Sequence, residues 1–224
     1  MVMEKKKNET LQNKIQFNLN NKMKAIYILL VCIFISADAF PQLGIKAFYF
    51  MPRGELGQVM KKNVGFEILK KEDFESSSFR LRYGVDFIPL KPRLDTFPAY
   101  AIRSDNNTAV LPGYISYDFC MTADMFFGMD FKILNEDKFN PYAGGDLIAG
   151  VMIYNYYKKI YGSSDGKVND GELFFSVRLR IGAEYNFSSR SGLFFDLSSA
   201  LYITESRFLC HYEAGLGISY RLRE

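Results

Sequence analysis

Alternation of apolar and polar residues, sustained over unusually long stretches, is the feature that most restricts what this chain can fold into. In residues 173–187 the odd positions are Leu, Phe, Val, Leu, Ile, Ala, Tyr and Phe, and the even positions beyond Phe174 are Ser, Arg, Arg, Gly, Glu and Asn. Successive side chains of a β-strand point to opposite faces of the sheet. This stretch therefore predicts a long strand with one apolar and one polar face.

The pattern recurs along the chain, and no amphipathic helix of useful length follows residue 40. It is clear in residues 79–87, 114–133 and 210–222, and weaker in 43–51, 64–71, 141–157 and 193–204. The chain therefore predicts eight strands. Their connections alternate between short polar turns near 72–78, 135–140 and 188–192 and longer loops near 52–63, 91–113 and 162–172, with a short one near 205–209. Short turns on one rim and long loops on the other are typical of a transmembrane barrel.

Alternation alone leaves two interpretations of the apolar face, which points either to lipid or into the core of a soluble lipid-binding barrel. The polar face decides between them, because it carries many glycines. Glycine weakens a strand and has no reason to gather on a water-facing surface, but it fits inside a narrow barrel. Strands much longer than the usual 5–6 residues or so point the same way. We therefore expect an all-β, eight-stranded antiparallel up-and-down transmembrane β-barrel.

The polar face then lines the lumen, where its cations and carboxylates can neutralise each other. Buried charges are tolerated when they are paired and hydrogen-bonded, and eight strands leave room for side chains but not for a wide channel. We expect a largely plugged lumen, with a narrow porin-like path for small solutes, ions or protons as the alternative. The predicted lumen charge network is Lys46, Glu67, Arg80, Arg82, Asp86, Asp118, Asp124, Asp130, Lys132, Asp146, Arg178, Arg180, Glu184, Asp196, Glu213 and Arg221.

The N-terminal region has the layout of a secretory signal peptide. Met23-Lys24 precedes an apolar run over residues 25–35, and the Ala-x-Ala site Ala37-Asp38-Ala39 follows this run. The run is too short to cross a bilayer as a helix, which needs about 20 residues. We predict an upstream extension from a mis-assigned start over 1–22, a cleaved signal over 23–39 and a barrel over 42–224. A genuine extension and a buried N-terminal helix or hairpin are the alternatives.

The charge balance and the few cysteines exclude several classes of protein. The chain has 28 Lys and Arg against 25 Asp and Glu, and the surplus lies in the first 39 residues, so the remainder is neutral. A nucleic-acid binder that depends on a basic patch is therefore excluded. Three Cys and one His argue against a disulfide scaffold and a His/Cys zinc site, and Cys120 and Cys210 are expected too far apart to pair. We expect no cofactor and no metal.

Two motifs suggest chemistry but do not complete it. His211 and Glu213 share a face, yet a hydrolase also needs a nucleophile within reach, and nothing ties Ser116 to them. We therefore expect that the chain is not an enzyme and that His211 is held in a hydrogen-bond network of the lumen. Residues 165–172 have the composition of a calcium loop without its spacing, which indicates a solvated turn.

The long loops are the expected contact surfaces. Arg103, Asp105 and Asn106 lie in the longest one, which prolines restrict and which could meet a surface partner or glycan. Tyrosines gather near residues 154–161 and indicate an aromatic belt at the membrane interface, with a sugar-binding platform as the alternative.

On these patterns the chain resembles the small eight-stranded outer-membrane barrels of the OmpA/OmpX type and the outer-membrane β-barrel domain proteins of Bacteroidetes. The resemblance covers residues 42–224 and rests on patterns, so it specifies a fold class more than one protein. It implies a monomer in the outer membrane of a Gram-negative cell, in contact with outer-membrane lipid, the assembly machinery and surface partners, and not with nucleic acid. One departure concerns the last strand, where Tyr220 is in phase but Leu222 follows it, because members often end this strand on an aromatic residue.

Overall fold

The computed structural model describes residues 42–222 apart from 75–77, 104–108, 135, 137, 162–165 and 204–207. The predicted extension over 1–22 and signal peptide over 23–39 therefore lie outside the described residues.

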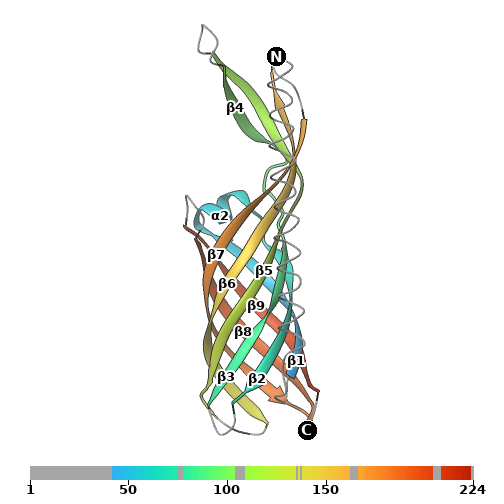
Figure 1. Cartoon of the computed structure of the whole chain (residues 1–224), viewed down its shortest axis with the longest axis vertical. Coiled ribbons are helices and arrows are strands. Elements are labelled where there is room, and N and C mark those ends of the chain that lie inside the picture. The colour runs from blue at the N-terminus through green and yellow to red at the C-terminus, as the bar shows by residue number, and fades with distance from the viewer. Residues whose placement is uncertain are drawn as a thin grey trace, which may run out of the picture. The chain divides into compact units, whose positions relative to one another are not determined.

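Eight antiparallel strands close into an up-and-down barrel (Figure 1), which confirms the predicted fold class. Each strand pairs with the next, β3 pairs with β5, and β9 pairs with β1 from Gln42↔Arg221 to Arg53↔Cys210 to complete the ring. Closure leaves the ring without an unpaired edge. The strands are β1 (Gln42–Arg53), β2 (Asn63–Asp73), β3 (Phe79–Pro89), β5 (Ala109–Lys132), β6 (Phe139–Ile160), β7 (Gly166–Asn186), β8 (Ser191–Ile203) and β9 (Phe208–Arg221).

The two rims of the barrel differ, as the sequence predicts. The lower rim carries the start of β1, the end of β9 and the short connections β2–β3, β5–β6 and β7–β8. The upper rim carries the short helix α2 (Gly54–Val59) and the connection β3–β4. Gly54 begins this helix with a φ of 55°, a conformation that favours glycine. No helix among the described residues is long and apolar enough to cross a membrane.

Above the upper rim, β5, β6 and β7 continue beyond the wall and carry a ninth strand, β4 (Phe97–Arg103), which pairs only with β5. We call β4 with these extensions the projecting sheet (Figure 1). The predicted long loop over 91–113 was wrong here, because the hairpin places Pro98 on an edge strand, where a missing N–H is tolerated. The solvated turn predicted over 165–172 was also wrong from Gly166 onward, where β7 pairs with β6.

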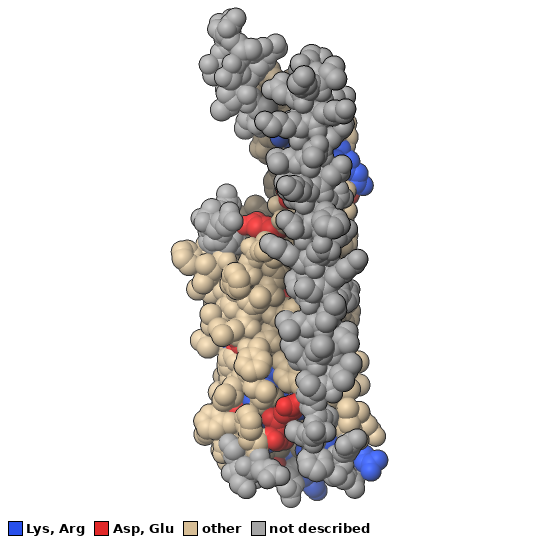
Figure 2. All heavy atoms as spheres, in the orientation of Figure 1, with Lys and Arg blue, Asp and Glu red and all other residues tan. Residues whose placement is uncertain are grey.

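The apolar face of the barrel points outward and the charged face inward. On β7, Phe175 and Leu179 are 68% and 67% exposed, whereas Arg178 between them is fully buried. On β8 every second residue is buried over the whole strand. In Figure 2 the visible wall is mostly uncharged, and charged atoms gather mainly toward its ends. This is the reverse of a soluble protein, whose charged residues lie on the outside.

Glycines on the inner face make room for large inward side chains. A Cβ added at Gly84 would meet the backbone carbonyl oxygen of Ile68 and lie 2.8 Å from the ring of Phe126. A Cβ at Gly182 would lie 2.7 Å from the ring of Tyr142. The glycines of the inner face therefore mark the positions at which large side chains cross the lumen.

Gly84→Ala is expected to destabilise the barrel by about 1–3 kcal/mol, because the added methyl meets backbone that cannot move aside. The measurement is the urea midpoint of the detergent-refolded protein. Gly166→Ala is the matched control, since a Cβ there has nothing within 4 Å. Equal midpoints for the two variants would contradict this packing.

Candidate functional site

The lower lumen is organised around the carboxylate of Glu184. Arg80 bonds to it, Lys71 Nζ lies 3.3 Å from Glu184 Oε2, and Gln42 Nε2 donates to Oε1 at 2.7 Å. Ser219 Oγ donates to the same oxygen at 2.8 Å. Arg80 Nη2 also donates to Asp130 at 3.0 Å, which links this cluster to the lumen above it.

Arg178 and Arg180 hold the middle of the lumen together. Arg178 donates from Nε to Asp146 and from Nη1 to Asp86, both at 2.7 Å. Arg180 donates to the same Asp146 at 2.8 Å and to Asp130 at 2.7 Å. Because Asp130 also accepts from Arg80, the lower and middle clusters form one network.

A second branch crosses from β1 to β8. Lys46 Nζ lies 2.8 Å from Glu67 and 3.2 Å from Asp196. Arg82 also bonds to Glu67, and Arg178 Nη2 lies 3.5 Å from Glu67. The two branches therefore meet at Arg178.

Among the described residues, six cations and seven carboxylates of this network are at most 2% exposed. Asp124 is as deeply buried, and Thr122 Oγ1 donates to it at 3.5 Å. Transfer of unpaired charges out of water is very unfavourable, so the pairs must satisfy one another. Aromatic rings cover some of the remaining cation faces: Arg82 and Arg178 both lie 4.8 Å from the centroid of Phe126. The buried charges are Lys46, Lys71, Arg80, Arg82, Arg178, Arg180, Glu67, Asp86, Asp124, Asp130, Asp146, Glu184, Asp196 and Glu213.

The upper lumen is apolar. Side chains from β1, β3, β5 and the upper connections form a cluster, the upper plug, which Leu56 of α2 joins. The charged network therefore ends below this mouth. The plug residues are Phe48, Phe50, Leu56, Met60, Ile88, Leu90 and Cys120.

His211 lies between the network and the plug. Its Nε2 is 2.7 Å from Glu213 Oε1, and its ring stacks on Tyr202 with centroids 4.9 Å apart. Ser198 Oγ donates to Glu213 and not to the imidazole, and His211 is only 1% exposed. This geometry orients a buried histidine but brings no hydroxyl of Ser198 to it for attack on a substrate.

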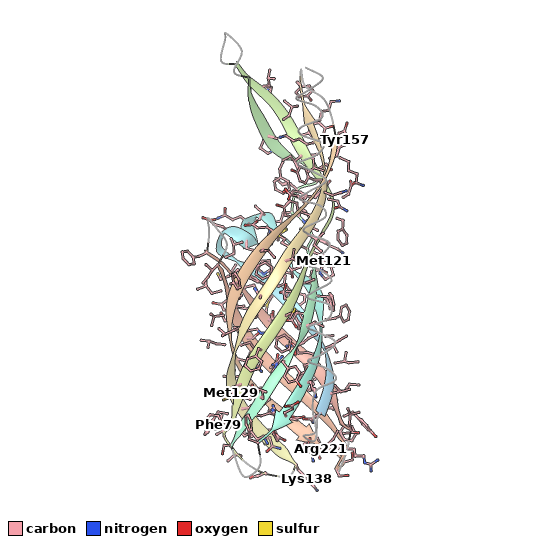
Figure 3. All side chains as sticks on the ribbon, in the orientation of Figure 1. Phe79, Met121, Met129, Lys138, Tyr157 and Arg221 are labelled. Atoms are coloured by element: carbon pink, nitrogen blue, oxygen red, sulfur yellow. The ribbon has the colours of Figure 1, made fainter. Side chains whose placement is uncertain are left out.

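At the lower mouth the lumen opens into a polar cavity of about 330 Å³. Lys132 and Arg221, predicted as lumen charges, line this cavity with Arg80 and Glu184. Lys132 pairs with Asp73 at 2.6 Å and is partly exposed. Lys132 and Arg221 therefore belong to the lower rim. Figure 3 places Arg221 and Lys138 near this end.

Asp118 was wrongly predicted to face the lumen. It is exposed, and its carboxylate pairs with Lys167 at 3.0 Å. A break in the β5–β6 register between Tyr117 and Phe119 inserts one unpaired residue, which shifts the phase of the strand.

Of the predicted outer-loop contacts, Arg103 is the last residue of β4, whereas Asp105 and Asn106 lie outside the described residues.

The sequence analysis did not identify some of the side chains that line the lumen. Lys71 was overlooked although it continues the inward phase of β2 after Leu69, and so were the inward aromatic and aliphatic residues. Those are Leu69, Phe126, Ile148, Phe174, Phe194 and Tyr202, which form a second cluster.

The predicted tyrosine group sits where the projecting sheet leaves the barrel. Tyr117 lies 5.8 Å from Tyr156 and 6.3 Å from Tyr154 between ring centroids, and Phe97 of β4 packs edge-on against Tyr117. Figure 3 shows Tyr157 in the same sheet. The arrangement is compatible with both an interfacial belt and a sugar platform.

Within the described part of the chain, no group of three or more His, Cys, Asp and Glu side chains is arranged to hold a metal ion. Cys120 and Cys210 are free thiols.

Comparison with solved structures places the fold among outer-membrane barrels. Neisserial surface protein A superposes with a TM-score of 0.51 at 12% identity, covering 81% of this chain and 97% of that one. Ail of Yersinia pestis, bound to the heparin analogue sucrose octasulfate, gives 0.45 at 13% identity over 82% and 99% of the two chains. The N-terminal barrel domain of Pseudomonas aeruginosa OprF gives 0.37 at 12% identity over 80% and 97%. No family model matches this sequence, and neither does any curated protein.

The chain therefore has the small eight-stranded barrel fold of Neisserial surface protein A. At this level of identity the likeness concerns the fold alone. The resemblance to Bacteroidetes barrel domains stays a prediction.

Arg178→Gln is expected to destabilise the barrel by about 3–5 kcal/mol, because it leaves the carboxylates around it uncompensated in a buried site. Lys167→Gln, in the exposed pair with Asp118, is the control and should cost less than about 1 kcal/mol. Urea unfolding in detergent measures both.

Adding Asp86→Asn to Arg178→Gln should recover part of the loss, since it removes one unpaired charge. A double variant as unstable as the two single changes summed would contradict the pairing.

Proposed function

We propose that this chain is an integral outer-membrane β-barrel protein with a plugged lumen, and that it acts as a structural or surface-interaction protein through its upper rim. The proposal extends to a cleaved signal peptide over 23–39, recognition of β9 by the assembly machinery, and a monomeric state. The closed ring of strands supports the last point, because it offers no free edge in the wall to a second copy.

The observation that carries the proposal is the outward apolar face of a closed barrel whose charges point inward. Large side chains such as Leu147, Phe175 and Leu216 are 61–68% exposed on the wall. A soluble monomer rarely exposes one continuous apolar patch beyond a few hundred Å². A bilayer is the solvent that stabilises such a surface, and the hydrogen-bonded ring satisfies the backbone within it.

The alternative of a soluble periplasmic lipid-binding barrel needs an apolar cavity inside. The described interior holds instead paired charges below and packed apolar side chains above. The interior therefore supports the membrane interpretation.

The lumen also favours a plug over a porin-like pore. Arg178 lies at the crossing of two ion-pair branches and is completely buried, and the upper plug lies between this network and the upper mouth. An ion crossing the barrel would have to separate the ion pairs of the network and then the packed side chains of the upper plug. The same enclosure of His211 supports a non-catalytic role.

A surface-interaction role is supported by the projecting sheet. Its tyrosine group, with Tyr117 and Tyr156 in ring contact, stands beyond the barrel wall and has β4 on one edge. Aromatic side chains present large contact area at low entropic cost.

The decisive test is heat modifiability of the detergent-refolded chain on a denaturing gel, beside a detergent-free solubility control. A shift in mobility on boiling, with no soluble folded form, is expected for the membrane barrel. A soluble folded monomer without a shift would overturn the proposal and would reverse the assignment of the two faces.

In planar bilayers the inserted protein should show no large, stable conductance, because the network and the upper plug close the lumen. Single-channel recording measures this directly. Stable current steps whose ion selectivity changes in Arg180→Gln would contradict the plug and establish the pore.

A further inference from the structure

Five cations gather on one side of the upper rim, at the end of β1 and in the connections β1–β2 and β3–β4. We call Arg53, Lys61, Lys62, Lys91 and Arg93 the basic rim. All five are exposed, and the same two segments, 53–62 and 90–96, contain only two acids, Glu55 and Asp95. The rim therefore carries a local positive charge, although residues 40–224 as a whole are neutral.

The backbone fixes these cations close together. A bridge between Met60 and Pro92 joins the two connections, Lys61 N donates to Lys91 O at 2.7 Å, and Arg93 N donates to Val59 O at 2.8 Å. In this antiparallel arrangement Lys61 lies opposite Lys91, and both side chains are exposed. Like charges directly opposite each other are destabilising. A bound anion would remove this repulsion.

The basic rim also lies at the upper end of three adjacent strands, β1, β2 and β3, whose outward side chains form part of the apolar wall. Lys62 is exposed immediately before β2, next to the exposed Val64 and Phe66, and Lys91 is exposed two residues after Pro89, where β3 ends. On β1, Arg53 follows Tyr49 and lies over the outward ring of Tyr212 on β9, 5.4 Å from its centroid. Cations at the end of an apolar column lie where the charged headgroups of a bilayer begin.

Exposed apolar residues adjoin the cations. Val59 and Leu94 are 39% and 57% exposed beside Arg93. A ligand with a negatively charged group and an apolar part can contact the cations and the exposed apolar residues together. On another part of the upper end, by contrast, the exposed Lys167 already has a carboxylate partner in Asp118.

We propose that the basic rim binds the phosphate groups of anionic membrane lipid in the leaflet at this rim. The inference rests on the proposed function, because it needs a barrel inserted in a bilayer. Lysine and arginine at a membrane surface attract anionic headgroups by charge, and the interaction weakens as salt rises.

The test uses the full chain in phosphatidylcholine bilayers that contain traces of spin-labelled phosphatidic acid or spin-labelled phosphatidylcholine. Electron spin resonance gives the share of each lipid immobilised on the protein. Wild type should prefer phosphatidic acid by about threefold or more. The preference should disappear in Lys62→Gln/Lys91→Gln and should fall in high salt.

Lys138→Gln/Lys167→Gln is the matched control, because it removes two exposed cations away from the basic rim and should keep the preference. A preference unchanged in Lys62→Gln/Lys91→Gln would overturn the inference. So would heparin binding in detergent that Lys62→Gln/Lys91→Gln abolishes, without any lipid preference in bilayers, since the cations would then serve a soluble polyanion.

A heat-modifiability gel on the same samples separates the two failures. Protein that stays outside the bilayer overturns the proposed function and the lipid site with it. Protein that inserts and shows no preference overturns the lipid site alone.

Discussion

Pairing of buried charges is the constraint on which the rest of this barrel depends. Arg178 and Arg180 share Asp146, and Arg80 and Arg180 share Asp130, so three cations from β3 and β7 are held by common carboxylates. Such a set is favourable only as a whole, because removal of one partner leaves another charge uncompensated in a buried site. The glycines of the inner face, the antiparallel register and the closed ring all serve to bring these side chains within reach.

The two faces of the wall follow from one two-residue period. If charges occupy the inner face, the apolar residues that alternate with them must point outward, and only a bilayer accommodates so much apolar surface on the outside of a closed sheet. Above the wall the constraint relaxes, since backbone and side chains there can meet water. The projecting sheet accordingly mixes tyrosines with exposed charges such as Lys167 and Asp170.

Much of this architecture could be predicted from the sequence, because the period of a strand is two and the hydrophobic pattern fixes its phase. Eight barrel strands and most of the inward charges follow from that rule. It fails where the geometry is not local. The extra residue at Asp118 reverses the phase of β5, and nothing in the alternation marks it. β4 carries Pro98, which reads as a loop residue, and forms only because β5 continues beyond the wall to pair with it. Inward aromatics such as Phe126 break the polar pattern, yet they fill space opposite glycine and stack on arginine. The gathering of Lys61 and Lys91 also depends on contact between distant connections.

The central claim is that alternate residues of the wall face lipid and a buried, charged interior. Spin labels on single cysteines, with the native cysteines replaced, test it most directly. Leu179 lies on the outward face of β7, Ser176 is buried in the lumen, and Lys167 is exposed on the projecting sheet. In bilayers, the label at 179 should collide often with oxygen and rarely with a water-soluble nickel complex. The label at 176 should be shielded from both, and the label at 167 should be open to nickel. A label at 179 that the nickel complex reaches freely would contradict the account.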